Sequence, residues 1–248
     1  MNISTTTRVV STAAVAIAVI ASAWILGGAW RSTHPHMQKI SVTGLAQRDF
    51  SSDLIVWRAS FSRKALSMKE AYPTLRQDVE RVRAYLVDKG VPAANIVFSA
   101  VNITQEYRTE QIGNGGRTQD VFDGVRLEQH VTVESPDVDR IENVSRQISE
   151  LIDAGIELNS QPPQYFFTKL AELKLDLLAR ASKDGRDRAE KIAEQAGGRL
   201  GSLLQADMGI FQITAQNSNE DYSWGGAFNT TSKRKTASIT VRMDFFSN

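Results

Sequence analysis

The stretch from residue 9 to residue 30 carries no charged side chain, and it constrains the rest of the chain more than any other feature. Its sequence is VVSTAAVAIAVIASAWILGGAW. At about 1.5 Å of rise per helical residue, a helix of this length reaches roughly 33 Å and crosses a hydrocarbon core of about 30 Å. The run therefore predicts a transmembrane anchor at residues 9–30 that contacts membrane lipid, after a cytoplasmic tail at residues 1–8.

A cleaved signal peptide is the alternative interpretation of the same run. Small residues stand at signal-peptidase spacing in Ala21-Ser22-Ala23 and again in Gly27-Gly28-Ala29. In both interpretations, the part of the chain after residue 30 is exported from the cytoplasm. We expect a single-pass protein of the bacterial inner membrane with its C-terminal domain in the periplasm, or else a protein released into the periplasm. Trp24 and Trp30 stand near the end of the run, where aromatic side chains suit the membrane interface.

The composition of the chain excludes several classes of function. There is no cysteine, which removes disulfides, thiolate nucleophiles and cysteine metal sites. The 29 basic and 28 acidic residues give a formal charge of +1, and no basic cluster marks a nucleic-acid surface. We therefore expect no nucleic-acid partner, and the stability of the fold has to come from its core.

The exported part begins with a polar linker at residues 31–38 and continues as a domain at residues 39–248. Three segments in this domain alternate apolar and polar side chains with period two, as a strand with one buried face does: Ile55–Phe61, Val121–Val133 and Ala237–Phe245. Strands of this kind favour an antiparallel sheet with one solvated face.

Two hairpins are predicted from the segments beside these strands. A long strand at Ala94–Glu110 leads through the glycines of residues 113–116 into the strand at Val121. A second hairpin pairs Gly209–Gln216 with Lys235–Phe246.

Three helices are predicted between the strands. Ser67 and Glu70 form a capping box before a helix that ends at Gly90, and Pro73 predicts a kink or a start near Thr74. The apolar stripe of this helix is predicted as Met68, Tyr72, Leu75, Val79, Val82 and Leu86. Two further helices are expected over about residues 138–154 and 168–196, and the second tolerates Gly185 in its middle. Its buried side is predicted as Leu170, Leu173, Leu177, Ala181, Ala189, Ile192 and Ala196. The fold class is α+β, an antiparallel-rich sheet with helices packed on one face, after one N-terminal transmembrane helix.

The sequence contains no recognisable catalytic motif. His34 and His36 fall in the linker, and His130 falls on the polar face of a strand, where a surface position explains it. A G-x-S-x-G elbow and a phosphate-binding loop are both missing from the sequence. We therefore expect no catalytic, cofactor-binding or metal site, and no cofactor.

The segment at residues 217–234 is long for a hairpin connection and carries three aromatic side chains among polar residues and glycines. Long connections in compact domains are binding elements or disordered segments. We interpret Tyr222, Trp224 and Phe228 as candidate contacts with a partner or another subunit. Packing of these rings back onto the domain and simple disorder are the alternatives.

Several short segments carry a family resemblance: Ser41–Gly44, the strand after Asp53, the passage from Leu86 through Gly90 to Ile96, and the helix Ala179–Ala196 with Gly197–Gly201 after it. Over about residues 39–248 the chain resembles the SIMPL-domain proteins of bacteria. The resemblance implies an exported or inner-membrane-tethered α+β protein. It also implies a link to oxidative-stress defence and assembly into large ring-like or channel-like oligomers, and it supplies no catalytic residues.

These observations lead to two functional hypotheses. The first is a non-enzymatic, membrane-anchored periplasmic protein that assembles into a large homo-oligomer, with a role in the envelope or in oxidative-stress defence. The second is a monomeric or small-oligomer binding module that holds another envelope protein or a ligand through the loop at residues 217–234.

Overall fold

The structure is a computed structural model that describes residues 15–26, 39–112, 116–219, 223 and 225–247. Residues 15–26 form a helix, and every side chain in it is exposed. Among the described residues, no helix is both long enough and apolar enough to cross a membrane. The predicted span at residues 9–30 continues beyond this helix in both directions, outside the described residues. Trp24 is exposed within the helix, and Trp30 lies outside the described part.

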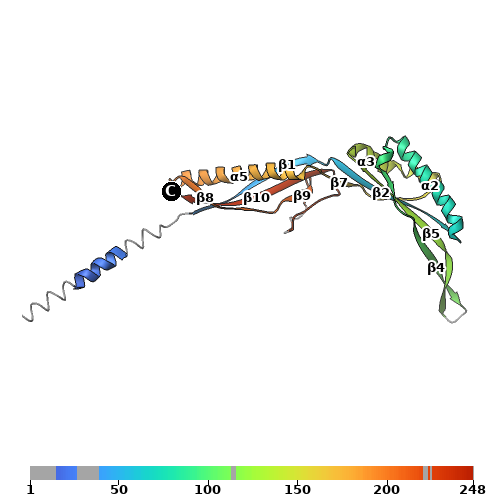
Figure 1. The fold of residues 1–248 in the computed structure, drawn as a ribbon, viewed down its shortest axis with the longest axis horizontal. Helices are drawn as coiled ribbons and strands as arrows, with labels where there is room; N and C mark the ends of the chain where they lie inside the picture. Colours follow the sequence, from blue (N-terminus) through green and yellow to red (C-terminus); the bar gives the residue numbers. More distant parts are fainter. Residues whose placement is uncertain (1–14, 27–38, 113–115, 220–222, 224, 248) are drawn as a thin grey trace, which may run out of the picture. The chain divides into compact units, whose positions relative to one another are not determined.

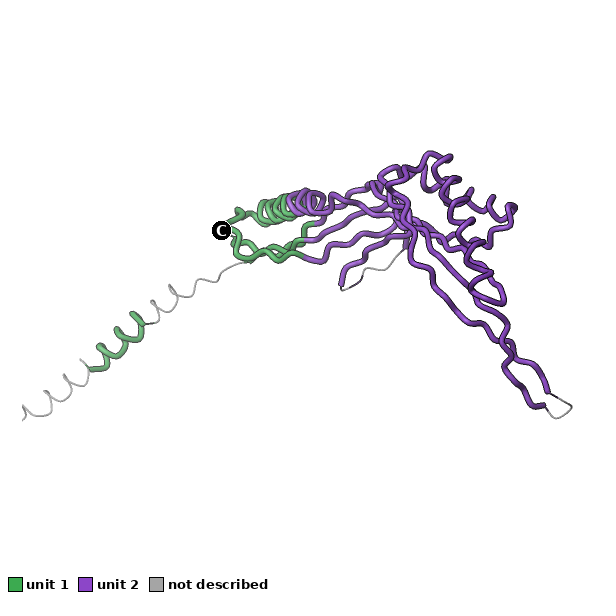
Figure 2. The backbone as a smooth tube through the Cα atoms, turned by 45° about the vertical axis from the view of Figure 1, so that its right-hand side comes forward, with its two compact units in different colours: residues 1–44, 181–208, 241–248 green, residues 45–180, 209–240 purple. Residues whose placement is uncertain are grey.

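The chain divides into two compact units, which Figure 2 shows in different colours. Unit 1 contains residues 1–44, 181–208 and 241–248, and unit 2 contains residues 45–180 and 209–240. The fold class is α+β with antiparallel strands, as predicted, but the strands form two sheets where the sequence predicted one.

A six-stranded antiparallel sheet is the centre of unit 2 (Figure 1). Its main path runs in the order β3-β5-β2-β6, while β4 also pairs with β5 and β7 with β2. The strands are β2 Leu54–Ala65, β3 Ile96–Phe98, β4 Asn102–Ile112, β5 Arg117–Ser135, β6 Glu157–Ser160 and β7 Gln164–Phe166.

The apolar face of this sheet packs against helices α2 Met68–Asp88, α3 Val138–Gln147 and α4 Glu150–Asp153. The predicted alternation is confirmed over Ile55–Phe61 and Val125–Val133, where the inward apolar side chains are buried. It is wrong at Val121, which is only half-buried. Ribbons of α2 and α3 lie on the same side of β2 and β5 in Figure 1. Leading members of the core are Ile55, Trp57, Phe61, Leu75, Leu86, Leu127, Ile141 and Ile148.

Helix α2 confirms the predicted cap, because the Ser67 side chain accepts a hydrogen bond from the backbone N–H of Glu70. The alternative start near Thr74 is wrong, since the helix begins at Met68 and includes Pro73. The predicted stripe is also wrong in the first turn, where Met68 and Tyr72 are exposed and Ala71 is buried instead. Farther along, the one helix predicted at residues 138–154 is two helices, α3 and α4.

The strand predicted at Ala94–Glu110 is interrupted. A short 3-10 helix η1 at Ala93–Asn95 precedes β3, and β4 starts only at Asn102. Between β3 and β4, the hydroxyl of Ser99 accepts a hydrogen bond from the backbone N–H of His130 at 3.0 Å. A side chain thus replaces a backbone acceptor in the ladder, so the strand breaks there. The predicted long hairpin is confirmed in β4 and β5, which pair from Asn102 with Glu128 to Ile112 with Arg117.

A four-stranded sheet contains β1 Lys39–Ser51, β8 Leu200–Met208, β9 Gln212–Ala215 and β10 Arg234–Ser247. Its path is β1-β10-β8, and β9 also pairs with β10. The predicted second hairpin is therefore corrected. Only Lys235–Ser238 pairs with β9, while Val241–Ser247 pairs with β8. Strand β8 was not predicted, because LGSLLQADM lacks the period-two alternation that marks a half-buried strand.

The long helix α5 Leu170–Gln195 confirms the predicted element, with small side chains as its buried residues in unit 1. Ile192 and Ala196 are wrong as core residues, because both are exposed, and Ala193 is buried instead. Gly185 is more than a tolerated residue: its backbone lies against that of Gly44. The buried side chains of unit 1 include Val42, Ala181, Ala189, Ala193, Val241, Met243 and Phe245.

Candidate functional site

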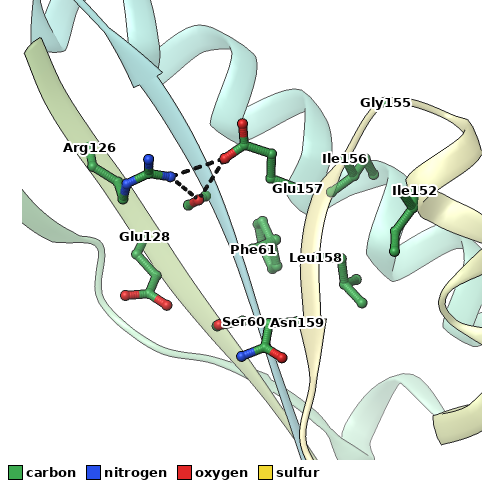
Figure 3. A pocket seen from close by; sticks show the side chains of 11 residues that line it. Ser60, Phe61, Arg126, Glu128, Ile152, Gly155, Ile156, Glu157, Leu158 and Asn159 are labelled. Carbon is green, nitrogen blue, oxygen red and sulfur yellow. Dashed lines mark hydrogen bonds and ion pairs between the residues drawn. The ribbon is translucent and has the colours of Figure 1, made fainter.

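The solvent-facing side of the six-stranded sheet carries a hollow of about 580 Å³ (Figure 3). Its floor consists of polar side chains from the outward positions of β2 and β5, which period-two alternation places on one face. The apolar part of its lining includes Ile152 of α4, Ile156, and Leu158 of edge strand β6. The lining includes Ser60, Ser62, Arg126, Glu128, Ile152, Glu157, Leu158 and Asn159.

Arg126 is the centre of an ion-pair network in this hollow. Its Nη1 donates to Ser62 Oγ at 2.9 Å and to Glu157 Oε2 at 3.0 Å. On its other side, Nε donates to Glu106 Oε1 at 2.5 Å. These contacts join β4, β5, β2 and β6 across their outer face, and Figure 3 shows the guanidinium turned toward Glu157.

Glu106 continues the network to a second cation, because Lys64 Nζ lies 2.8 Å from its Oε2 and also contacts Asp123. Hydrogen bonds from Arg126 and then Lys64 favour the ionised carboxylate and lower the pKa of Glu106 to about 2. Each cation is therefore compensated by two carboxylates, and the network holds the strands in register.

The chemistry that this hollow offers is binding through polar groups. The Ser62 hydroxyl donates to Glu157 Oε2 at 3.1 Å and accepts from Arg126, so its polar capacity is used within the network. The Glu128 carboxylate lines the hollow and makes no ion pair among the described residues. No group of three or more metal-ligating carboxylates and imidazoles occurs in the part of the chain that the structure describes.

His130 lies opposite Ser60 on the polar face of the same sheet, which confirms its predicted cross-strand surface position. His34 and His36 lie outside the described residues. The sequence also placed Arg126 and Glu128 on this polar face. It did not connect Arg126 with Ser62 or Glu157, because these residues come from strands far apart in the chain.

Of the predicted contact residues in the loop at 217–234, Tyr222 and Trp224 lie outside the described residues. Phe228 is described, and its side chain is 58% exposed. Its neighbours are bonded to β9, because Ile213 N donates to Ala227 O at 2.7 Å and Asn229 N donates to Ile213 O at 3.0 Å. The backbone here is thus attached to the domain, while the Phe228 ring remains in contact with solvent.

A second exposed surface was missed by the sequence reasoning. Strand β8 stands at one end of its sheet, and β10 is its only pairing partner within the described residues. Its side chains from Ser202 to Met208 are all exposed, including those of Leu203 and Leu204. The available signal was a pair of leucines between polar residues after a helix-ending glycine.

Comparison with known proteins gives the family of the chain. No curated protein matches it. The family model described as SIMPL, protein of unknown function (DUF541), matches residues 40–245, which is most of the described chain. This match confirms the resemblance carried by the segments after Ser41 and around Gly90 and Gly197, and the chain belongs to the SIMPL family.

Proposed function

We propose that the protein is a non-enzymatic, membrane-anchored envelope protein whose functional form is a homo-oligomer assembled through the edges of its four-stranded sheet. The observation that carries this proposal is strand β8. It is a nine-residue edge strand, and its exposed side chains include Leu203, Leu204 and Met208.

An edge strand with apolar side chains is a template for pairing with another chain, and soluble monomers normally protect such edges with charges or prolines. Strand β8 has one charged residue, Asp207, and no proline. Because the strand carries a single charge, a second copy meets little electrostatic repulsion when it pairs antiparallel about a two-fold axis. A second copy of this chain is therefore the partner that fits β8 best.

The other end of the sheet supports assembly beyond a dimer. Strand β1 terminates the path β1-β10-β8, so the sheet has two edges. Subunits with two separate contact surfaces build larger closed assemblies. An anchor at residues 9–30 would add to this effect, because subunits held in one membrane have a higher effective concentration.

The membrane anchor itself is supported by the uncharged run in the sequence. The described part of this run, residues 15–26, exposes every one of its side chains, including Ile17, Ile20 and Leu26. An apolar helix with no buried side needs an apolar environment around it, which a lipid bilayer supplies. The proposed location is the inner membrane with residues 39–248 in the periplasm.

The test is the mass of the detergent-solubilised full chain, measured by analytical ultracentrifugation and negative-stain microscopy. We expect a symmetric particle larger than a monomer. The double variant Leu203→Lys/Leu204→Lys places two charges on the edge and should shift the protein toward the monomer. Leu175→Lys is the control, because Leu175 is also an exposed leucine but lies on α5. It should leave the particle unchanged.

A monomeric wild-type protein would contradict the proposal, as would a β8 variant that retains the full particle mass. The binding-module alternative instead expects the wild type to be a monomer or a small oligomer. Phe228→Ser in the same experiment tests whether the loop at 217–234 contacts another subunit. Loss of the particle in this variant would place the loop in the subunit contact. The role in oxidative-stress defence rests on the family resemblance, and peroxide sensitivity of a strain lacking the protein tests it.

A further inference from the structure

Unit 2 contains a small cavity of about 40 Å³ that is separate from the hollow around Arg126. Its walls are mainly aromatic, and the rings of Phe50 and Phe167 meet there with their centroids 4.8 Å apart. The other lining residues include Tyr165, Leu170, Ile213, Phe228, Thr230 and Lys235. The cavity is thus apolar around most of its surface, with one cationic side chain.

That cation, Lys235, is 3% exposed. Its Nζ donates to the backbone oxygen of Tyr165 at 2.5 Å and to that of Asn229 at 2.6 Å. An ammonium group has three N–H donors. The third donor of Lys235 has no acceptor among the described residues, and no carboxylate there forms an ion pair with it.

A buried charge without a counter-ion is costly, so proteins pair it, neutralise it or let it bind an ion. Loss of solvation alone lowers the pKa of Lys235 to about 8. The nearby carboxylates are engaged elsewhere: Asp49 with Gln216 and Thr236, Asp53 with Thr168, and Asp139 and Glu142 with Lys233. The charge of Lys235 at neutral pH is therefore uncompensated within the described structure.

We propose that this cavity binds a small carboxylate of the size of acetate, which accepts a hydrogen bond from Lys235 and places its carbon end against the phenylalanine rings. The volume is about three times the roughly 10–15 Å³ that one water molecule requires, which suits a ligand of a few heavy atoms. A group of waters fits less well, because each needs several polar partners and the walls are aromatic. Tyr165, Asn229 and Thr230 supply the other side-chain donor groups of the lining.

The first test is isothermal titration calorimetry of the full chain with sodium acetate at about neutral pH, against sodium chloride at equal ionic strength. We expect saturable binding of acetate in the millimolar range or tighter, within reach of a four-atom ligand. Lys235→Met removes the ammonium but keeps a long apolar chain, and it should abolish binding. Lys191→Met removes an exposed lysine of α5 and should bind acetate like the wild type.

The second test needs no variant and therefore does not depend on how Lys235→Met folds. Acetate remains ionised at alkaline pH, whereas only about 1% of Lys235 is protonated at about pH 10, two units above its pKa. Acetate affinity should therefore fall about 100-fold between pH 7 and pH 10. Neighbouring Tyr165 and Lys233 do not produce this change, because the pKa of each is raised.

Absence of saturable acetate binding at neutral pH would overturn the proposal. Binding that is unaffected by pH, or that persists in a folded Lys235→Met protein, would overturn it equally. The inference is independent of oligomerisation, because the whole cavity lies within unit 2 and shares no residue with β8. A monomeric protein that binds acetate would thus contradict the proposed assembly and leave this site in place.

Discussion

Gly44 on β1 and Gly185 on α5 lie backbone against backbone, with no room for a side chain between them. A Cβ atom added at Gly44 would meet the Ala181 carbonyl oxygen and would lie 2.6 Å from the Gly185 nitrogen. The same helix turns its small side chains Ala181 and Ala189 inward. Glycine at position 44 is therefore what allows helix and strand to approach closely in unit 1.

Gly44→Ala should destabilise the protein by about 2–3 kcal/mol, because the new methyl group collides with backbone atoms that move only if the helix moves. Gly185→Ala should cost less. Its added methyl group meets the flexible end of Met243, and alanine gains about 1 kcal/mol over glycine in a helix. Urea unfolding followed by circular dichroism measures both. Equal stability of Gly44→Ala and the wild type would contradict the close approach.

Arg63 and Asp78 form an ion pair between β2 and α2 whose contribution to stability can be measured. The Asp78 side chain is fully buried on the inner face of α2. Arg63 of β2 donates two hydrogen bonds to its carboxylate, one from Nε to Oδ2 and one of 2.9 Å from Nη2 to Oδ1. Arg63→Met leaves that carboxylate buried without its main counter-ion and should cost about 3–5 kcal/mol in thermal unfolding.

Asp78→Leu is the matched variant on the other side of this pair. It leaves Arg63, whose side chain is 22% exposed and reaches water, so the loss should be smaller. The double variant Arg63→Met/Asp78→Leu should recover much of the loss, since an apolar pair replaces a buried ion pair. Additive losses would show that the two residues act independently.

Glu106 should make the stability of the folded protein depend on pH in the acid range. Its pKa is about 2 in the folded protein and 4.5 as the ordinary value, so the ionised group favours the folded state. This contribution is complete above about pH 4.5 and disappears as the pH falls toward about 2. Glu106→Gln should therefore be less stable than the wild type near neutral pH and equally stable near pH 2.

Urea midpoints measured across this pH range test the expectation at low salt, where exposed ion pairs are least screened. The control is Glu172→Gln, which removes an exposed carboxylate of α5 that has no ion pair among the described residues. The stability difference between Glu106→Gln and this control should grow as the pH rises from about 2 to about 4.5. A difference that stays constant over this range would show that Arg126 and Lys64 do not favour the ionised form of Glu106.

Local patterns in the sequence were sufficient for individual elements. The alternation at Ile55–Phe61 and at Ala237–Phe245 predicted which apolar side chains are buried, because the two faces of a strand follow directly from its period. The cap at Ser67 was predictable because its hydrogen bond spans three residues. The family also followed from such short segments, as the match over residues 40–245 shows.

Tertiary structure decided the features that join residues distant in the chain. The division into two sheets, the pairing of β8 with β10, the network around Arg126 and the burial of Lys235 all depend on which strands become neighbours. From the sequence, Gly185 was only a tolerated residue within a helix, whereas its contact with Gly44 gives it a role in packing. Periodicity reports which face of an element is apolar, but only packing determines what that face meets.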